Sequence, residues 1–242
     1  MEKNKPKIEI FRGNALDVLR GDIGFFDAVI TDPPYSSGAA TLSGKQASTA
    51  KKYTETQGRC PFPDFAGDSM DQRAWAHMMR EVLEAARKKC SQGAPLAVFI
   101  DWRNLPNLTD AVQWAGWFLR GVAVWDKLTC RPQKGRFRQQ AEFIVWGSNG
   151  HMPSTRNAPC LPGVFRAANV QGAERIHQTQ KPLEVMRQIV RITEPGGRIL
   201  DPFAGGGSTL AAAQAEGYSA AGIEIHGEIA DAAAERLHLK SA

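Results

Sequence analysis

The residues with the clearest chemical potential are Asp32-Pro33-Pro34-Tyr35, which directly follow the apolar run Ala28 to Thr31. The run predicts a short buried strand, and two prolines cannot continue a strand ladder, so the strand ends there. A carboxylate and an aromatic ring are therefore expected at a strand's carboxyl end, where open α/β sheets bind ligands. A solvated Asp after a Pro-Pro turn is an equally good interpretation of these four residues alone.

Residues of these types suit the methylation of a planar exocyclic amine. Such a nitrogen is a poor nucleophile because its lone pair is delocalised into the ring. Asp32 and the backbone carbonyl of Pro33 could accept hydrogen bonds from both amine protons and favour the pyramidal form. Tyr35 could stack on the base. A second motif has to decide between this chemistry and the plain turn.

The second motif is Arg198 to Thr209, which contains Asp201-Pro202-Phe203-Ala204-Gly205-Gly206-Gly207. A strand, a glycine turn and a helix N-terminus in this order form a ligand-binding elbow. Glu224 ends a second strand roughly 20 residues later, where an acid can accept hydrogen bonds from ribose hydroxyls. Together these residues indicate a cofactor that contains a nucleoside. A nicotinamide dehydrogenase is a less favoured alternative, because the elbow is C-terminal and Asp32 to Tyr35 would then have no role.

In this order the motifs resemble those of the amino-group DNA methyltransferases that use S-adenosylmethionine, in the beta arrangement where DPPY precedes the glycine motif. The segment His177-Gln178-Thr179-Gln180-Lys181-Pro182 resembles the one that precedes the family's cofactor motif. The resemblance covers both ends of the chain and the strand at Glu142 to Trp146. It implies an α/β, Rossmann-like S-adenosylmethionine-dependent methyltransferase fold, with a mostly parallel seven-stranded sheet and helices on both faces.

The resemblance also implies the residues of the site. The catalytic residues would be Asp32, Pro33, Pro34 and Tyr35, and the cofactor would contact Asn14, Ala15, Asp32, Thr179, Gln180, Lys181, Asp201, Phe203, Ala204, Gly205, Gly207, Ser208, Thr209 and Glu224. Lys181 would meet the amino-acid moiety of the cofactor. The family commonly has an Asp where this chain has Asn14, and an amide can both donate and accept there. No metal is expected.

The first residue of the DPPY motif bears on the base that is modified. An Asp there resembles the adenine-N6 enzymes, whereas a Ser is commoner in cytosine-N4 enzymes. We therefore expect transfer of a methyl group from S-adenosylmethionine to N6 of a flipped-out adenine in double-stranded DNA. Cytosine-N4 methylation of DNA, methylation of RNA, and a DNA-binding protein that retains the fold without turnover are alternatives.

Positive charge is modest overall, since the formal net charge is +5, so its distribution matters more than its total. The segment Lys127 to Arg138 contains five cations and no acid, and a loop there could contact phosphates. A solvated basic loop is the alternative. The expected DNA-binding residues are Lys51, Lys52, Arg131, Lys134, Arg136 and Arg138, and Arg156 and Arg166 are further candidates.

Length and composition favour one domain over residues 1–242, because 43% of 242 residues are hydrophobic. Loop insertions at 36–71 and 127–138 and a short variable segment at 151–176 are the candidate DNA-contacting regions. We expect strands at 8–11, 28–31, 95–100, 121–125, 141–146, 198–201 and one ending at 224, with the strands at 121–125 and 141–146 antiparallel. Helices are expected at 15–20, 71–90, 183–192 and after 208, and another that includes 111–118 and is capped by Asn107 or Thr109.

Four cysteines, Cys60, Cys90, Cys130 and Cys160, lack the close spacing of a metal site and are expected to be reduced thiols. No signal peptide and no membrane span are expected from the polar N-terminus and the short apolar runs. These features predict a cytoplasmic protein, and the family resemblance implies that it associates with DNA. A homodimer could supply further DNA contacts.

Overall fold

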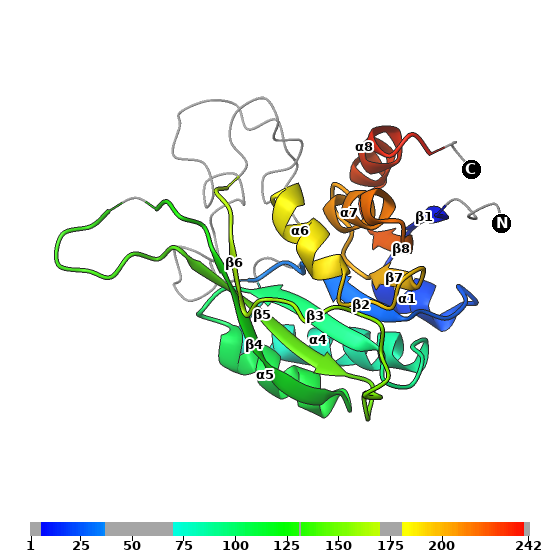
Figure 1. Ribbon diagram of the computed structural model, residues 1–242, viewed down its shortest axis with the longest axis horizontal. Helices are drawn as coiled ribbons and strands as arrows, with labels where there is room; N and C mark the ends of the chain where they lie inside the picture. Colours follow the sequence, from blue (N-terminus) through cyan, green and yellow to red (C-terminus); the bar gives the residue numbers. More distant parts are fainter. Residues whose placement is uncertain (1–5, 37–69, 131, 170–180, 240–242) are drawn as a thin grey trace.

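The computed structural model describes residues 6–36, 70–130, 132–169 and 181–239, which form one mixed sheet flanked by helices (Figure 1). The strands are β1 (Ile8–Arg12), β2 (Ala28–Thr31), β3 (Pro95–Ile100), β4 (Phe118–Asp126), β5 (Ala141–Ser148), β6 (Val164–Arg166), β7 (Arg198–Asp201) and β8 (Ser219–Glu224). The helices are α1 (Ala15–Arg20), α4 (Gln72–Lys88), α5 (Leu105–Trp114), α6 (Leu183–Val190), α7 (Ser208–Glu216) and α8 (Gly227–Arg236).

The sheet has eight strands in the described residues, in the order β1-β8-β7-β2-β3-β5-β4-β6, so the expected seven was one too few. The additional strand, β6, lies in the variable segment 151–176, where we expected no strand. Three residues are too short to show an alternating pattern, and β6 is recognisable only by its pairing with β4. The first five strands of the sheet order are parallel, while β5 runs antiparallel to both β3 and β4, as expected for β4 and β5.

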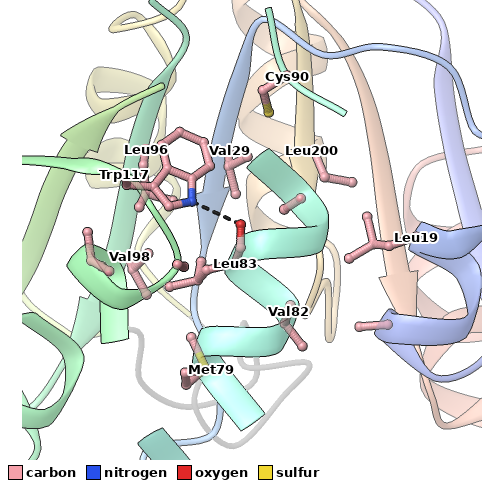
Figure 2. Packing of buried hydrophobic residues seen from close by; sticks show 14 of the residues in the cluster. Leu19, Val29, Met79, Val82, Leu83, Cys90, Leu96, Val98, Trp117 and Leu200 are labelled. Carbon is pink, nitrogen blue, oxygen red and sulfur yellow. Dashed lines mark hydrogen bonds between the residues drawn. The ribbon is translucent and has the colours of Figure 1, made fainter. Parts of the chain in front are cut away.

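Helices cover both faces of the sheet, as the family resemblance implied. Figure 1 shows α6, α7 and α8 above the sheet and α4 and α5 below it. One apolar core lies beneath α1, α4 and α5, and Figure 2 shows its packing. In that core the indole nitrogen of Trp117 donates a hydrogen bond to the Leu83 carbonyl at 2.9 Å. The second core joins α6 and α7 to the opposite face of the sheet, so the central strands are buried on both sides.

Helix boundaries follow local capping chemistry. Asp71 caps α4, because its side chain accepts hydrogen bonds from the amides of Arg73 and Ala74 at 3.0 Å each, and this confirms the expected start. The expected caps and end of α5 were wrong. That helix follows Asn104 and ends before Gly116, whose positive φ of 83° ends the helix, and β4 then begins at Phe118.

The strand order decides where the two motifs lie. β2 pairs in parallel with β7 on one side and β3 on the other. The Asp32 to Tyr35 segment and the glycine turn after β7 therefore leave the same edge of the sheet from adjacent strands. The chain continues toward β8 on one side and β3 on the other, which makes this edge a topological switch point.

The described residues carry two further simple findings. Within them, no helix has the length and apolar content needed to cross a lipid bilayer. Cys90, Cys130 and Cys160 are free thiols. Cys60 lies outside the described residues, as does the 36–71 insertion apart from Ser36, Met70 and Asp71.

Candidate active site

A buried hydrogen bond joins the two sequence motifs. The hydroxyl of Thr31, at the end of β2, donates to Asp201 Oδ1 at 2.6 Å, and the amide of Phe203 donates to the same oxygen at 3.0 Å. Asp201 is only 2% exposed. Burial raises the pKa of Asp201 to about 6, against the opposing hydrogen bonds from Thr209, Thr31 and the Phe203 amide. The carboxylate therefore fixes the glycine turn against the strand that precedes Pro33.

The glycine turn after β7 has the backbone shape of a ligand-binding elbow. Gly205 and Gly207 have φ values of 49° and 75°, which favour glycine. A Cβ atom on Gly205 would meet no heavy atom within 4 Å, so the space above this turn is open. The Gly205 amide donates to Glu224 Oε2 at 2.9 Å, and the His226 amide donates to Oε1 at 2.9 Å. Glu224 thus lies beside the turn, as the ribose-binding expectation requires.

Gly222 has a role at the elbow that our sequence reasoning missed. A Cβ atom on Gly222 would approach the Cβ of Ala204 to 2.7 Å and two Leu210 methyl groups to 3.0 Å. The absence of a side chain therefore allows the turn to pack closely against β8. A glycine inside a strand is the signal that could have indicated this contact.

Two side chains that we did not predict as site residues hold the DPPY backbone in place. The indole nitrogen of Trp75, on α4, donates to the Pro34 carbonyl at 2.7 Å. The side-chain amide of Asn104, which precedes α5, donates to the Tyr35 carbonyl at 2.5 Å. Both side chains are buried, at 0% and 2% exposure.

Lys181 is in direct contact with the DPPY side chains. Its ammonium nitrogen lies 2.7 Å from Asp32 Oδ2, 2.9 Å from the Tyr35 hydroxyl oxygen and 3.5 Å from Glu142 Oε1. The Tyr35 hydroxyl donates to Asp32 Oδ1 at 2.7 Å. Glu142, on β5, was not among the predicted site residues. A single acid in an apolar strand is the signal that sequence reasoning could have used.

Burial and charge act together on the pKa values of this cluster. Burial raises the pKa of Asp32 and outweighs the ammonium of Lys181, while the charge of Glu142 raises it further. Burial also raises the pKa of the Tyr35 phenol well above its ordinary value, and the two carboxylates add to this effect. Tyr35 therefore stays protonated and donates to Asp32. The Asp32 side chain keeps 20% of its surface exposed, so a further donor can approach it.

The other expected cofactor residues lie around the elbow or outside the described residues. Asn14 is exposed and caps α1, since its side chain accepts a hydrogen bond from the Leu16 amide at 2.9 Å, and Ala15 follows it in the helix. Ser208 and Thr209 open α7, and Ala204 packs in the turn. Thr179 and Gln180 lie outside the described residues, as do Lys51, Lys52 and Arg131.

The basic segment Lys127 to Arg138 connects β4 to β5. Lys134, Arg136 and Arg138 are exposed there, and Phe137 is 100% exposed. Figure 1 shows this connection extending away from the body of the protein.

The two candidate arginines of segment 151–176, Arg156 and Arg166, differ in their surroundings. The Arg166 side chain is 74% exposed. Arg156 instead pairs with Glu194 at 2.8 Å and donates to the Ile192 carbonyl at 2.5 Å, so its guanidinium faces the protein. This ion pair favours a structural role for Arg156 rather than the expected DNA contact.

Comparison with known proteins places this fold and site in a family. A DNA methylase family model of the N6/N4 type matches residues 26–235. The chain belongs to this family and is a DNA methyltransferase of the N6/N4 type, which confirms the resemblance seen in its motifs.

Individual relatives agree with this assignment. The Escherichia coli (strain K12) protein YubD is 27% identical over 229 residues, which are 94% of this chain and 84% of YubD. The crystal structure of the M1.HpyAVI-SAM complex has a TM-score of 0.68 at 22% identity, over 96% of this chain and 100% of that chain. The PvuII DNA methyltransferase, described as cytosine-N4-specific, has a TM-score of 0.68 at 16% identity, over 96% of this chain and 87% of that chain. These two structural likenesses show the fold.

Proposed function

We propose that this protein transfers a methyl group from S-adenosylmethionine to the exocyclic N6 amine of an adenine flipped out of double-stranded DNA. The observation that carries the proposal is the hydrogen bond from Thr31 to Asp201, which joins the two motifs at one edge of the sheet. An acceptor for an amine and an elbow for a nucleoside-bearing cofactor are thereby held on adjacent strands.

The residues at the elbow fit this cofactor. Open space lies above Gly205, where the backbone can be approached closely, and Glu224 offers carboxylate oxygens at the end of β8. We propose that these two residues, with Asp201, Phe203 and Gly207, hold the cofactor. When bound, S-adenosylmethionine supplies an electrophilic methyl group on its sulfonium. The similar structure of M1.HpyAVI is a complex with SAM, which supports the choice.

The DPPY residues supply the chemistry of the acceptor base. Asp32 and the Pro33 carbonyl accept hydrogen bonds from the two amine protons, which favours the pyramidal nitrogen whose lone pair can attack. Tyr35 stacks on the flipped base. The new N–C bond forms as the bond between the methyl carbon and sulfur breaks, and the sulfur keeps that electron pair. One amine proton must then leave, and Asp32 is a base able to take it. Its raised pKa improves it for that step.

Cations on the connection between β4 and β5 are proposed to contact DNA phosphates. Lys134, Arg136 and Arg138 are exposed, and the loop begins where β4 ends, close to the edge that carries the site. Contacts of this kind add affinity without reading sequence. We propose the 127–138 segment, with Arg166, as part of the DNA-binding surface. A homodimer that extends this surface stays a prediction.

Cytosine-N4 methylation of DNA is the second candidate. PvuII DNA methyltransferase has the same fold and is described as cytosine-N4-specific. The acceptors Asp32 and Pro33 could serve either amine, so the preference for adenine depends on the Asp that begins the DPPY motif.

The test is transfer of labelled methyl from S-adenosylmethionine to unmethylated duplex DNA, followed by mass spectrometry of the nucleosides. We expect N6-methyladenine from the wild type and no product from Asp32→Ala, with cofactor affinity retained in that variant. Asp110→Ala, which changes an exposed Asp on α5, is the matched control and should remain active. N4-methylcytosine as the product would establish the second candidate, and full turnover by Asp32→Ala would remove Asp32 from the mechanism.

A further inference from the structure

Lys181 is buried far more deeply than a lysine usually is. Its side chain is 5% exposed and lies among the rings of Tyr35, Phe99 and Trp125, with its ammonium 5.1, 5.2 and 5.9 Å from their centres. Removing a charge from water this completely is costly unless opposite charges and hydrogen bonds compensate. The buried ammonium of Lys181 therefore requires compensating groups close to it.

Three separate elements bring the compensating groups to Lys181. Asp32 follows β2, Lys181 precedes α6, and Glu142 lies near the start of β5. Because β5 runs antiparallel to β3, its first residues lie at the edge where β2 and β3 end. Burial alone would lower the pKa of Lys181, but the charges of Asp32 and Glu142 reverse this effect and raise it. The ammonium consequently stays charged between two carboxylates.

The geometry restricts Asp32 to one orientation. Lys181 donates to Oδ2 and the Tyr35 hydroxyl donates to Oδ1, both at 2.7 Å. A carboxylate has about four acceptor positions on its two oxygens, so both oxygens can still accept from an amine. Lys181 also donates to the Tyr35 oxygen, which links the two DPPY side chains through a single cation.

We propose that Lys181, with Glu142 as its second counter-charge, is a positioning residue that orients Asp32 and Tyr35 and keeps Asp32 ionised for the methyl acceptor. The inference deepens the proposed function and depends on it. It also replaces the expectation that Lys181 contacts the amino-acid moiety of the cofactor. Lys181 acts through Asp32 and makes no contact with the reacting atoms.

The proposal predicts opposite pH shifts for two substitutions. The ionisable groups of the described residues that act on Asp32 are Lys181, Tyr35 and Glu142, and Asp32 in turn interacts with Asp201. Lys181→Met removes the charge that lowers the pKa of Asp32, so the acidic limb of the kcat–pH profile should move up by about one unit or more. Glu142→Gln removes a charge that raises this pKa, so the same limb should move down.

Measurements of kcat and of cofactor affinity distinguish a positioning role of Lys181 from a role in cofactor recognition. Lys181→Met should lower kcat by about 100-fold, as expected when a reacting group loses its orientation, and should change the dissociation constant of S-adenosylmethionine by less than about threefold. Lys181→Arg keeps the charge and the hydrogen-bond donors, so its kcat should be about tenfold higher than that of Lys181→Met. Lys88→Met, at the end of α4, is the control and should match the wild type.

A direct measurement of the Asp32 titration does not require turnover. The carboxyl carbon of Asp32 can be followed by NMR in protein labelled with carbon-13 aspartate, and its signal assigned by its absence in Asp32→Asn. The midpoint should rise in Lys181→Met, fall in Glu142→Gln and stay within about half a unit in Lys181→Arg. If Lys181→Met does not fold, the fall in Glu142→Gln and the unchanged midpoint in Lys181→Arg carry the test.

Failure of the inference is distinguishable from failure of the proposed function. Midpoints that move in the same direction in both charge-removing variants, or that do not move, would overturn the role of Lys181. So would a tenfold weaker cofactor affinity in Lys181→Met with an unchanged acidic limb, since Lys181 would then serve the cofactor. A wild type that binds S-adenosylmethionine but transfers no methyl to DNA would overturn the proposed function and, with it, the catalytic purpose of Lys181.

Discussion

Replacing Asp201 with Asn should change how the free energy of unfolding depends on pH. Burial holds the pKa of Asp201 at about 6 in the folded protein, compared with an ordinary value of 3.8. Each unit of difference corresponds to about 1.4 kcal/mol, so ionising Asp201 costs the folded state about 3 kcal/mol in full. Because the pKa is raised in the folded state, the protein keeps about 3 kcal/mol of stability below about pH 4 that it loses as the pH rises through about 6.

The assay is urea denaturation of the ligand-free protein from about pH 4 to pH 8, for the wild type and Asp201→Asn. Other titrating groups affect both proteins alike, so the difference between the two curves isolates Asp201. The wild type should lose about 2 kcal/mol or more relative to the variant over this range. Thr31→Val, which removes a hydrogen bond to the carboxylate, should enlarge the loss. Parallel curves for the wild type and Asp201→Asn would refute the reasoning.

The remaining predictions concern the DPPY backbone and the basic connection. Trp75→Phe leaves the partly buried Pro34 carbonyl without its donor and should lower the free energy of unfolding by about 1–3 kcal/mol. Trp114→Phe, at an exposed position, should change it by less than about 0.5 kcal/mol, and equal effects of the two substitutions in chemical denaturation would contradict the role of the Trp75 indole. Changing Lys134, Arg136 and Arg138 to Gln should reduce the salt dependence of DNA binding, measured by fluorescence anisotropy, by about one phosphate contact per residue. The same charge change at Arg20, Lys88 and Arg191, at the ends of α1, α4 and α6, should leave that slope intact, and a shared decrease would mean that only net charge matters.

Local sequence was enough to predict the two motifs and the strands that carry them. Prolines after Asp32 end β2 at Thr31, and the glycines after Asp201 allow the turn into α7, because both effects arise within a few residues of backbone. Periodicity likewise predicted α4 and its cap at Asp71. The family could be inferred from the order of these motifs, and the family model confirms it.

Short elements and connections were harder to predict from the sequence. β6 has three residues and exists because β4 offers it an edge to pair with, which no local pattern can indicate. The start of α5 was misplaced by a few residues, since Asn107 and Thr109 are good capping types but lie inside the helix. Capping chemistry at the level of sequence identifies candidates, and tertiary packing selects among them.

The sequence by itself determined that an acceptor segment at Asp32 and a cofactor elbow at Asp201 leave the ends of two strands. Only the tertiary structure decided that β2 and β7 are neighbours, because strand order depends on packing between segments far apart in the chain. The same holds for Lys181 and Glu142, which are 149 and 110 positions from Asp32 in the chain. Glu142 lies at this edge because β5 is antiparallel to β3, and Lys181 lies there because it precedes α6. A buried charge is stable only where its partners converge, and that convergence is a property of the folded sheet.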